Sequence, residues 1–275
     1  MRGSDLTNDG DWLHSSIGHS TPESITVRGY DLANEVMGEM PFSDLAFLLA
    51  SGRIPTEGES RLFNAVLASL ADHGLTPTAL ATRFTYTGAP ESIQGAIAAG
   101  LLGAGSVFLG PVEDTAAFLD EILAQLPNER AADDAALEAA AAAGVRAAVQ
   151  AGRRIPGLGH PIHRETDPRT PRLYELGRET GLAGPHLRLL ELVAAAHRAQ
   201  TGKALPINGA GAAGATLADL GFPPHLARAF ALLARTAGLI GHLAEESQRP
   251  IGMRLWREVD SRAAAAEEGA DNEPS

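Results

Sequence analysis

The chain has 275 residues, of which 44% are hydrophobic and 20% are charged, a composition typical of a globular protein with a substantial core. Lysine and arginine together number 22 against 34 acidic residues, and the resulting net charge of −12 argues against non-specific binding to nucleic acid or to anionic membranes. The absence of cysteine excludes disulfides, thiolate nucleophiles and zinc–thiolate sites. Because we find neither an apolar run of transmembrane length nor a signal-peptide core, we expect a cytoplasmic protein without a membrane partner.

In chain order, residues 1–11 are polar and are predicted to be disordered, and residues 12–28 are β-prone in places, which indicates a small hairpin or an extended strap. From Gly29 onward helix signals dominate. The predicted helices are a segment capped by Ser43 and ending at Gly52, a segment from Leu62 to Asp72, and then 93–102, 113–126, 131–151, 171–181, 185–200, 209–220 and 224–246. Asp114 or Thr115 is the expected cap of the fourth segment. We predict an all-α fold, with residues 261–275 as a second disordered tail.

Two sets of side chains repeat every seven residues in the segment 224–246. The first set, predicted to be a core stripe, is Leu226, Leu233 and Ile240. The second set, predicted to be a basic stripe on the roughly opposite face, is Arg228, Arg235 and His242. A basic stripe of this kind is usually solvated, and the alternative is that it binds an anionic ligand.

The stretch 156–169 reads P-G-L-G-H-P-I-H-R-E-T-D-P-R, and its glycines and prolines predict an irregular loop. Glycines allow a ligand to approach the backbone, and exposed amides of such a loop suit an anion or a purine edge. His160 could exchange a proton near neutral pH. The alternative is a structural turn with a hydrogen-bonded histidine. Asp167 and Arg169 are expected to form an ion pair.

Two further patterns have competing interpretations. The spacing H-x-x-H of His160 and His163 would suit a metal on a helix, but the loop is not helical and no third ligand stands at a metal-site spacing, so we predict no metal. The segment from Asn208 contains G-x-G-x-x-G at Gly209, Gly211 and Gly214. Because no strand precedes it, we favour a tight helix entry with close packing over a dinucleotide site.

The pattern G-x-G-H, followed by D-P-R seven residues after the histidine, resembles the active-site loop of citrate synthases and the related citryl-CoA lyases. Further matches extend this resemblance over most of residues 12–256. It implies a large helical domain made of residues 12–109 and 213–260, a smaller helical domain of residues 110–212 inserted between them, and a ligand cleft between the two.

The resemblance also implies a set of site residues. His160 would act as the catalytic base, and the residues that would bind substrate carboxylates are His73, Arg169, Arg235 and Arg249. His73 follows a helix, so a capping role is the alternative. The family places the residue matching Arg249 in the partner's site, which implies a homodimer. The implied coenzyme A (CoA) binding residues are Ile155, Pro156, Gly157, Leu158, Gly159, Lys203 and Asn208, with Arg153 and Arg154 near the phosphates.

Two departures from the family pattern stand out. Phe108 occupies the place of the family's second catalytic histidine, and Ala210 occupies the place of its enolising aspartate. Neither side chain can donate a hydrogen bond to the enolate of acetyl-CoA or accept the methyl proton whose loss forms that enolate. Such an enolate would need backbone amides near 105–110 or 209–211.

The resemblance therefore implies a carbon–carbon bond lyase, or the reverse condensing enzyme, that acts on a hydroxyacyl-CoA thioester. The substrates would be a CoA thioester and a di- or tricarboxylate, with no tightly bound cofactor. The alternative is a catalytically silent homologue that binds CoA or a carboxylate as a regulatory or assembly partner.

Overall fold

The computed structural model describes residues 15–127 and 133–270, except for the side chains of 267–270, so the predicted disorder of 1–11 lies outside the described residues. The chain divides into two compact units, one ending at Arg61 and one beginning at Leu62.

The first unit opens with a small antiparallel sheet. Its strands are β1 (Gly18–Ser20), β2 (Ile25–Val27) and β3 (Tyr30–Asp31), paired in that order, so the predicted hairpin is confirmed. Arg28 and Gly29 form the tight turn between β2 and β3, and both have positive φ, 50° and 87°. A short π-helix, η1 (Leu32–Val36), follows, capped by the Asp31 carboxylate. The Arg28 guanidinium then donates to the Leu49 carbonyl, which ties the sheet to the next helix.

That helix, α1 (Phe42–Ser51), ends as predicted at Gly52, whose φ of 77° is left-handed. The predicted cap was wrong: Ser43 lies inside the first turn, and Pro41 holds the cap position without a side-chain hydrogen bond. The next helix, α2 (Glu57–Ala71), starts with a capping box, because Thr56 and Glu59 each accept the other's backbone N–H through their side chains. α2 begins in the first unit and continues into the second.

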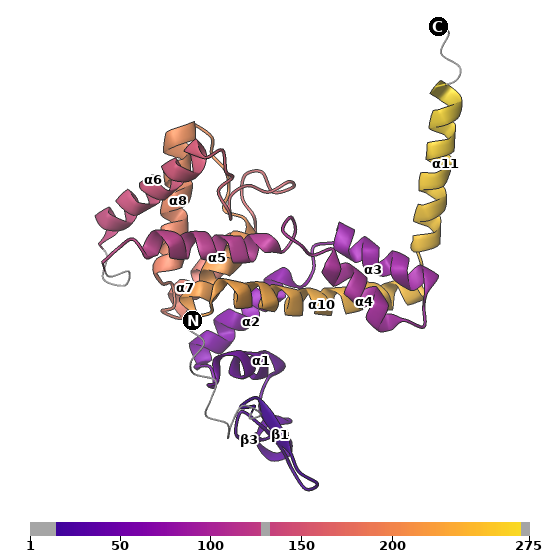
Figure 1. Cartoon of the computed structure of the whole chain (residues 1–275), viewed down its shortest axis with the longest axis horizontal. Helices are drawn as coiled ribbons and strands as arrows, with labels where there is room; N and C mark the ends of the chain where they lie inside the picture. Colours follow the sequence, from indigo (N-terminus) through magenta and orange to yellow (C-terminus); the bar gives the residue numbers. More distant parts are fainter. Residues whose placement is uncertain (1–14, 128–132, 271–275) are drawn as a thin grey trace, which may run out of the picture. The chain divides into compact units, whose positions relative to one another are not determined.

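In the part of the second unit that the structure describes, the elements are helices joined by loops, with one isolated β-bridge between Leu158 and Ile207, and the all-α prediction is confirmed (Figure 1). After the end of α2 it contains α3 (Pro77–Gly88), α4 (Ile93–Leu102), α5 (Gly110–Leu123), α6 (Asp134–Gln150), α7 (Arg169–Glu179), α8 (Pro185–Thr201), α9 (Gly209–Asp219), α10 (Pro224–Gln248) and α11 (Gly252–Ala270).

Three features of this unit differ from the sequence predictions. α3 and α11 were not predicted, and α11 stays helical to Ala270, where a disordered tail was expected from 261, because its alanine run has high helix propensity. α5 begins at Gly110 with Pro111 in its first turn, and neither Asp114 nor Thr115 caps it. Instead, the Thr115 hydroxyl donates to the Pro111 carbonyl, 2.6 Å away.

Helix α10 packs against α3 and α4 and also against α5 and α9, as Figure 1 shows. The helices α5, α6, α8 and α9 contact one another, and α7 contacts α9. The predicted domain boundaries at 109/110 and 212/213 stay a prediction. By length and composition α10 could cross a membrane, although the buried core helix of a soluble protein passes the same test.

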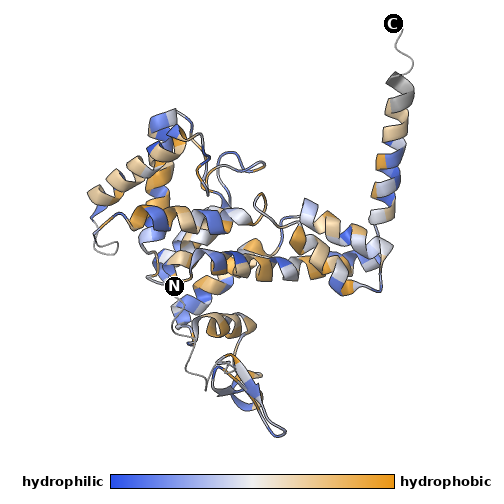
Figure 2. Cartoon of the chain, in the orientation of Figure 1, coloured by the Kyte–Doolittle hydropathy of each residue, from blue (hydrophilic) through white to orange (hydrophobic). Residues whose placement is uncertain are grey.

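The core face of α10 is not the predicted one. Ile240, assigned to a core stripe, is 53% exposed, whereas Arg235, assigned to a basic surface stripe, is 6% exposed. The buried positions of α10 are Ala227, Phe230, Ala231, Ala234, Arg235, Leu239, Leu243 and Glu246. These positions recur at three- and four-residue steps, because neighbouring helices cover a face with the 3.6-residue helical period, not a strict seven-residue repeat. Apolar and polar residues alternate along α10 (Figure 2).

Candidate active site

The C-terminal end of α2 brings together three of the predicted carboxylate-binding residues. The guanidinium of Arg169 donates to the Ser69 carbonyl at 3.3 Å, and that of Arg235 donates to the Leu70 carbonyl at 3.2 Å. His73 follows directly after this helix end. The last carbonyls of a helix lack partners within it and carry partial negative charge, which suits two cations.

Close packing of α10 against α2 places Arg235 at this point. A Cβ atom on Gly238 would lie 2.0 Å from the Ala71 carbonyl oxygen, so only glycine permits the observed approach. Arg235 stands one helical turn earlier on α10. The absence of a Cβ at position 238 therefore lets the end of α2 lie close to the turn of α10 that carries Arg235.

Arg235 is a buried cation that forms no ion pair with a carboxylate in the part of the chain that the structure describes. It is 6% exposed, and its Nε has no hydrogen-bond partner among the described residues. Burial lowers the pKa of its guanidinium, the nearby Arg169 charge lowers it further, and Asp72 acts in the opposite direction. Leaving a charged donor unpaired in the interior is costly, so this geometry calls for an anion from outside the chain.

Arg169, in contrast, is already paired. Its Nε and Nη2 donate to the two oxygens of Asp167 at 3.0 and 2.7 Å, which confirms the predicted ion pair. Asp167 is fully buried and also accepts the Gly209 amide at 2.7 Å. Burial alone would raise the pKa of the Asp167 carboxyl, but hydrogen bonds from Arg169 and Gly209 hold it well below its usual range. A Cβ on Gly209 would lie 2.3 Å from the Arg169 side chain, so this glycine makes room for the guanidinium.

The glycine-rich loop is fixed to the start of α9. Gly157 and Gly159 both have a φ of 81°, which favours glycine. The Gly159 amide donates to the Pro206 carbonyl at 2.7 Å, and the Asn208 amide donates to the Gly157 carbonyl at 2.9 Å. The Asn208 side chain caps α9 through the Gly211 amide and donates to the Gly159 carbonyl, both at 2.8 Å. Asn208 therefore locks the loop that carries His160.

The close-packing interpretation of the G-x-G-x-x-G segment is confirmed. A Cβ on Gly211 would lie 2.5 Å from the Cα of Gly157, and one on Gly214 would lie 2.3 Å from the Val112 carbonyl oxygen. The predicted CoA-binding residues are unevenly placed: Ile155, Gly157 and Asn208 are buried, whereas Arg153, Arg154 and Lys203 are exposed. Their role toward CoA stays a prediction.

The hydrogen bonds of His160 define the protonation of its ring. Nδ1 accepts the amides of Ile162 and His163, at 3.1 and 3.0 Å, so the neutral ring carries its proton on Nε2. Burial lowers the pKa of His160, with a further contribution from His163, while Asp167 opposes them. In this state Nε2 is a hydrogen-bond donor and cannot accept a second proton, which conflicts with the simple prediction of a base.

His163, which was not among the predicted site residues, completes a cluster of three imidazoles with His73 and His160. One nitrogen from each ring lies within 4.8 Å of the others, and the Nε2 atoms of His73 and His163 are 3.3 Å apart although the residues are 90 positions apart. The rings of His160 and His163 stack with centroids 4.5 Å apart. Burial lowers the pKa of His73, assisted by the Arg169 charge, and so favours its neutral ring.

This cluster supplies the third histidine that the sequence did not place near H-x-x-H. Three imidazoles are a familiar zinc ligand set. However, metal on Nε2 of a neutral His160 would leave the ring proton on Nδ1, facing the amides of Ile162 and His163. The arrangement of donors around His160 therefore favours a hydrogen-bonding role for this ring.

The two departures from the family pattern, Phe108 and Ala210, lie near the starts of two different helices, α5 and α9. Phe108 is 41% exposed in the turn before α5. The amides of Phe108, Leu109 and Gly110 all donate to the Gly105 carbonyl in the described state, and the role of amides near 105–110 toward an enolate stays a prediction. The Gly209 and Gly211 amides are also used, by Asp167 and Asn208. In the first turn of α9, the Ala210 amide is without an acceptor among the described residues.

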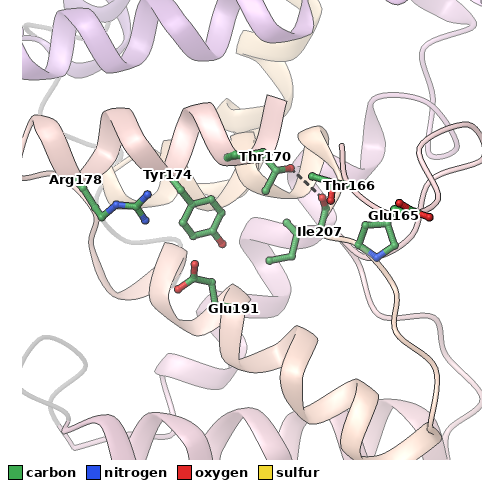
Figure 3. Close-up of a pocket in the computed structure, with 9 residues that line it drawn as sticks. Glu165, Thr166, Thr170, Tyr174, Arg178, Glu191 and Ile207 are labelled. Atoms are coloured by element: carbon green, nitrogen blue, oxygen red, sulfur yellow. Dashed lines mark hydrogen bonds between the residues drawn. The ribbon is translucent and has the colours of Figure 1, made fainter. Parts of the chain in front are cut away.

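Two hollows lie near α7. One, of about 310 Å³, lies among α7, α8 and the 206–207 segment, and the Thr170 hydroxyl donates to the Ile207 carbonyl at its edge, 2.9 Å away (Figure 3). It is lined by none of the predicted site residues. The other, of about 300 Å³, is lined by Arg169 together with Ser69 and residues of α7. Of the two, only the second touches the cluster of cations at the end of α2.

Comparison with known proteins identifies the family. Residues 56–258 match the family model described as citrate synthase, C-terminal domain. A search of curated proteins found no match. The structure of citryl-CoA lyase from Hydrogenobacter thermophilus is 31% identical in sequence, with a TM-score of 0.76, over 86% of this chain and 87% of that one.

Two structures of ATP citrate lyase share the fold at lower identity. A mutant from Methanosaeta concilii in complex with (3S)-citryl-CoA is 21% identical, with a TM-score of 0.70 over 87% of this chain and 39% of that one. The enzyme from Methanothrix soehngenii in complex with citrate and coenzyme A is 20% identical, with a TM-score of 0.71 and the same coverage. The family model covers most of the chain, and the citryl-CoA lyase from Hydrogenobacter thermophilus is 31% identical to it. The chain therefore belongs to the citrate synthase superfamily and is citryl-CoA lyase-like.

Proposed function

We propose that this protein cleaves a carbon–carbon bond in a hydroxyacyl-CoA thioester, as a citryl-CoA lyase-like enzyme. The observation that carries the proposal is Arg235, a buried guanidinium whose Nε has no partner, beside Arg169 and His73 at the end of α2. Guanidinium groups bind carboxylates through paired hydrogen bonds, and two of them suit a di- or tricarboxylate. The similarity to citryl-CoA lyase over most of both chains supports the same assignment.

Cleavage begins at the substrate hydroxyl. Its proton leaves, the carbon–oxygen bond becomes a carbonyl, and the adjacent carbon–carbon bond breaks with its electron pair forming the thioester enolate. The enolate then takes a proton to give the acyl-CoA product. With its proton on Nε2, His160 donates to the substrate oxygen instead of accepting from it. The hydroxyl proton then needs another acceptor, and the rings of His73 and His163, each with a nitrogen within 4.8 Å of one on His160, are candidates for it.

The same site is poorly equipped to start from acetyl-CoA. Removing a proton from the methyl group needs a base at that carbon and a donor at the thioester oxygen, each contributing about 10²–10³-fold or more. Phe108 and Ala210 supply neither. We therefore expect slow or no uptake of deuterium from solvent into acetyl-CoA, measured by mass spectrometry. Rapid uptake would show that another group acts as the base and would overturn this assignment.

The central test is the effect of Arg235→Met on citryl-CoA. Wild-type protein is expected to release acetyl-CoA from citryl-CoA, followed by mass spectrometry, and Arg235→Met is expected to bind the thioester about 30- to 1,000-fold more weakly, because a buried charge pair is lost. Arg228→Met is the matched control, since Arg228 lies on the same helix, is partly exposed and pairs with Glu113. Equal losses in both variants would contradict the proposed anion site.

The alternative is a catalytically silent homologue, favoured by the loss of two family side chains at Phe108 and Ala210. It predicts that citryl-CoA and CoA bind to the wild-type protein in a thermal-shift assay without any turnover. Binding of dicarboxylates that depends on Arg235 would then identify a regulatory or assembly role.

We further propose a cytoplasmic homodimer in which Arg249 serves the partner's site. Arg249 is exposed at the end of α10, and α11 carries Met253, Trp256 and Val259 on one face, 44%, 55% and 66% exposed. Mixing Arg249→Ala with His160→Ala subunits is expected to restore activity in heterodimers. A monomer in sedimentation, or an absence of complementation, would count against a shared site.

A further inference from the structure

A chain of hydrogen bonds connects the buried ion pair of α3 and α10 to the turn that carries His73. It starts at Arg83, which is 2% exposed and donates to Glu246 at 2.9 Å. It continues through His242 on α10 and ends at Asp72, the residue before His73. None of Arg83, His242 and Asp72 is among the site residues that the family resemblance implies.

Arg83 determines the protonation of His242. Its Nε and Nη2 both lie within hydrogen-bond distance of His242 Nδ1, at 3.1 and 3.0 Å. Arginine has only donors, so Nδ1 must be the acceptor and the proton of the neutral ring must lie on Nε2. That nitrogen points to the Asp72 carboxylate, 2.9 Å from Oδ1. The donor direction is therefore Arg83 to His242 to Asp72.

Asp72 in turn fixes the turn at the end of α2. Its Oδ2 accepts the Gly74 amide at 2.8 Å, and Gly74 has a φ of 76°. Burial alone would raise the pKa of the Asp72 carboxyl, but hydrogen bonds from Gly74 and His242 lower it and keep it ionised. One carboxylate oxygen thus holds the backbone on the far side of His73, and the other is held by His242.

We propose that His242 is a positioning residue for His73: it aims Asp72, which sets the backbone of the His73 turn and so the place of the His73 ring among Arg169, Arg235 and His163. The role of His73 toward a substrate carboxylate rests on the proposed function. The placement of its ring by His242 does not.

Part of this series of hydrogen bonds is not needed for packing or for charge balance. Arg83 already has Glu246 and also contacts Glu245, so its charge is balanced without the imidazole. The Asp72 side chain is 48% exposed and could be satisfied by water. The hydrogen bond from His242 to Asp72 adds a fixed orientation of the Asp72 carboxylate at the turn. Residues behind a site orient the groups that contact a ligand in the same way.

The test compares His242→Leu with His242→Gln. Glutamine retains an amide that can accept from Arg83 and donate to Asp72, and leucine retains only bulk. We expect His242→Leu to raise KM and Kd for citryl-CoA by about 10- to 100-fold with a smaller effect on kcat and no change in the Kd of free CoA, and we expect glutamine to restore most of the affinity. Equal losses in both variants would assign His242 to packing and overturn the proposal.

A second readout is independent of activity. In ¹⁵N-histidine-labelled protein, the ring signals of His73 are expected to shift in His242→Leu and to stay near wild type in His242→Gln. His197, whose Nδ1 lies 3.2 Å from the Lys203 carbonyl, is the internal control. An unmoved His73 signal would refute the proposal even if the enzyme cleaves citryl-CoA. A moved signal in a protein without cleavage would sustain it while the proposed function fails.

If His242→Leu does not fold, Asp72→Ala and Asp72→Asn provide a second comparison at a half-exposed position. Asparagine keeps one acceptor oxygen for the Gly74 amide but presents an NH₂ donor to the Nε2–H of His242, whereas alanine removes both contacts. A His73 signal that shifts with asparagine as well as with alanine is the expected result. A shift with alanine alone, or with neither variant, would overturn the proposed role.

Discussion

Two buried arginines at the interface of α10 with its neighbours differ in one respect. Arg83 is 2% exposed and bonded to Glu246, Glu245 and His242. Arg235 is 6% exposed and donates to the Leu70 carbonyl, and its Nε has no hydrogen-bond partner among the described residues. The first guanidinium is neutralised within the chain, and the second is not. The difference indicates that Arg83 serves the fold and that Arg235 awaits an anion.

The histidines divide in the same way. His186 is buried between two aspartates, with Nδ1 2.8 Å from Asp219 and Nε2 2.8 Å from Asp120. Burial alone would lower the pKa of His186, but the hydrogen bond and charge of Asp219, followed by those of Asp120, raise it. His73 and His160 lie beside two arginines instead, and their pKa values are lowered. The pKa of His186, which is paired with aspartates, is therefore raised, whereas those of His73 and His160 at the candidate site are lowered.

The largest expected effect that tests this comparison is the loss of stability caused by replacing Arg83. Arg83→Met would leave Glu246, 2% exposed, as an uncompensated buried charge, and we expect the free energy of unfolding to fall by about 3–5 kcal/mol. Urea denaturation measures it. Adding Glu246→Gln is expected to recover part of the loss. A loss below about 1 kcal/mol would mean that the pair is not structural.

The next effect concerns His186 and its dependence on pH. A raised pKa in the folded state contributes stability that is fully present below the unfolded value of about 6.5 and is lost as pH rises through the folded value. We therefore expect His186→Asn to destabilise the protein by about 1–3 kcal/mol at pH 6 and by less at pH 9. Denaturation curves of both proteins across this range measure the difference. A penalty that grows with pH would contradict the assigned charge.

Arg235→Met is not expected to lower the free energy of unfolding, in contrast to Arg83→Met. Replacing an unpaired buried charge by an apolar side chain of similar length is expected to leave the free energy of unfolding unchanged or to raise it by about 1 kcal/mol in the absence of ligand. The same urea experiment measures it, with Arg228→Met as the surface control. A loss as large as that of Arg83→Met would remove the distinction between the two arginines.

The smallest expected effect is proton uptake at His73. Burial and the Arg169 charge lower its pKa in the free protein, and a bound carboxylate would raise it. Between these two values the complex holds a larger fraction of a proton, so binding of a dicarboxylate should tighten as pH falls towards the free value. Calorimetry in buffers of different ionisation enthalpy detects the uptake. His73→Gln is expected to abolish it, and uptake that persists in that variant would assign the proton elsewhere.

Several features of the protein could be predicted from the sequence because their physical causes are local. The loop with Gly157 and Gly159 and the pair of Asp167 and Arg169 follow from residues a few positions apart. The helical character followed from apolar periodicity and turn residues. The predicted caps at Ser43 and at Asp114 or Thr115 were wrong, because the helices begin earlier, at Phe42 after Pro41 and at Gly110 before Pro111.

What only the tertiary structure decided is how distant segments converge. His163 reaches His73 across 90 positions, and the carbonyls of Ser69 and Leu70 hold arginines from α10 and from the start of α7, which no spacing in the sequence indicates. The burial of Arg235 depends on the neighbours of α10, and the amides near Phe108 were taken by the Gly105 carbonyl once the turn closed. Helical periodicity fixes which residues share a face, whereas long-range packing fixes what that face meets.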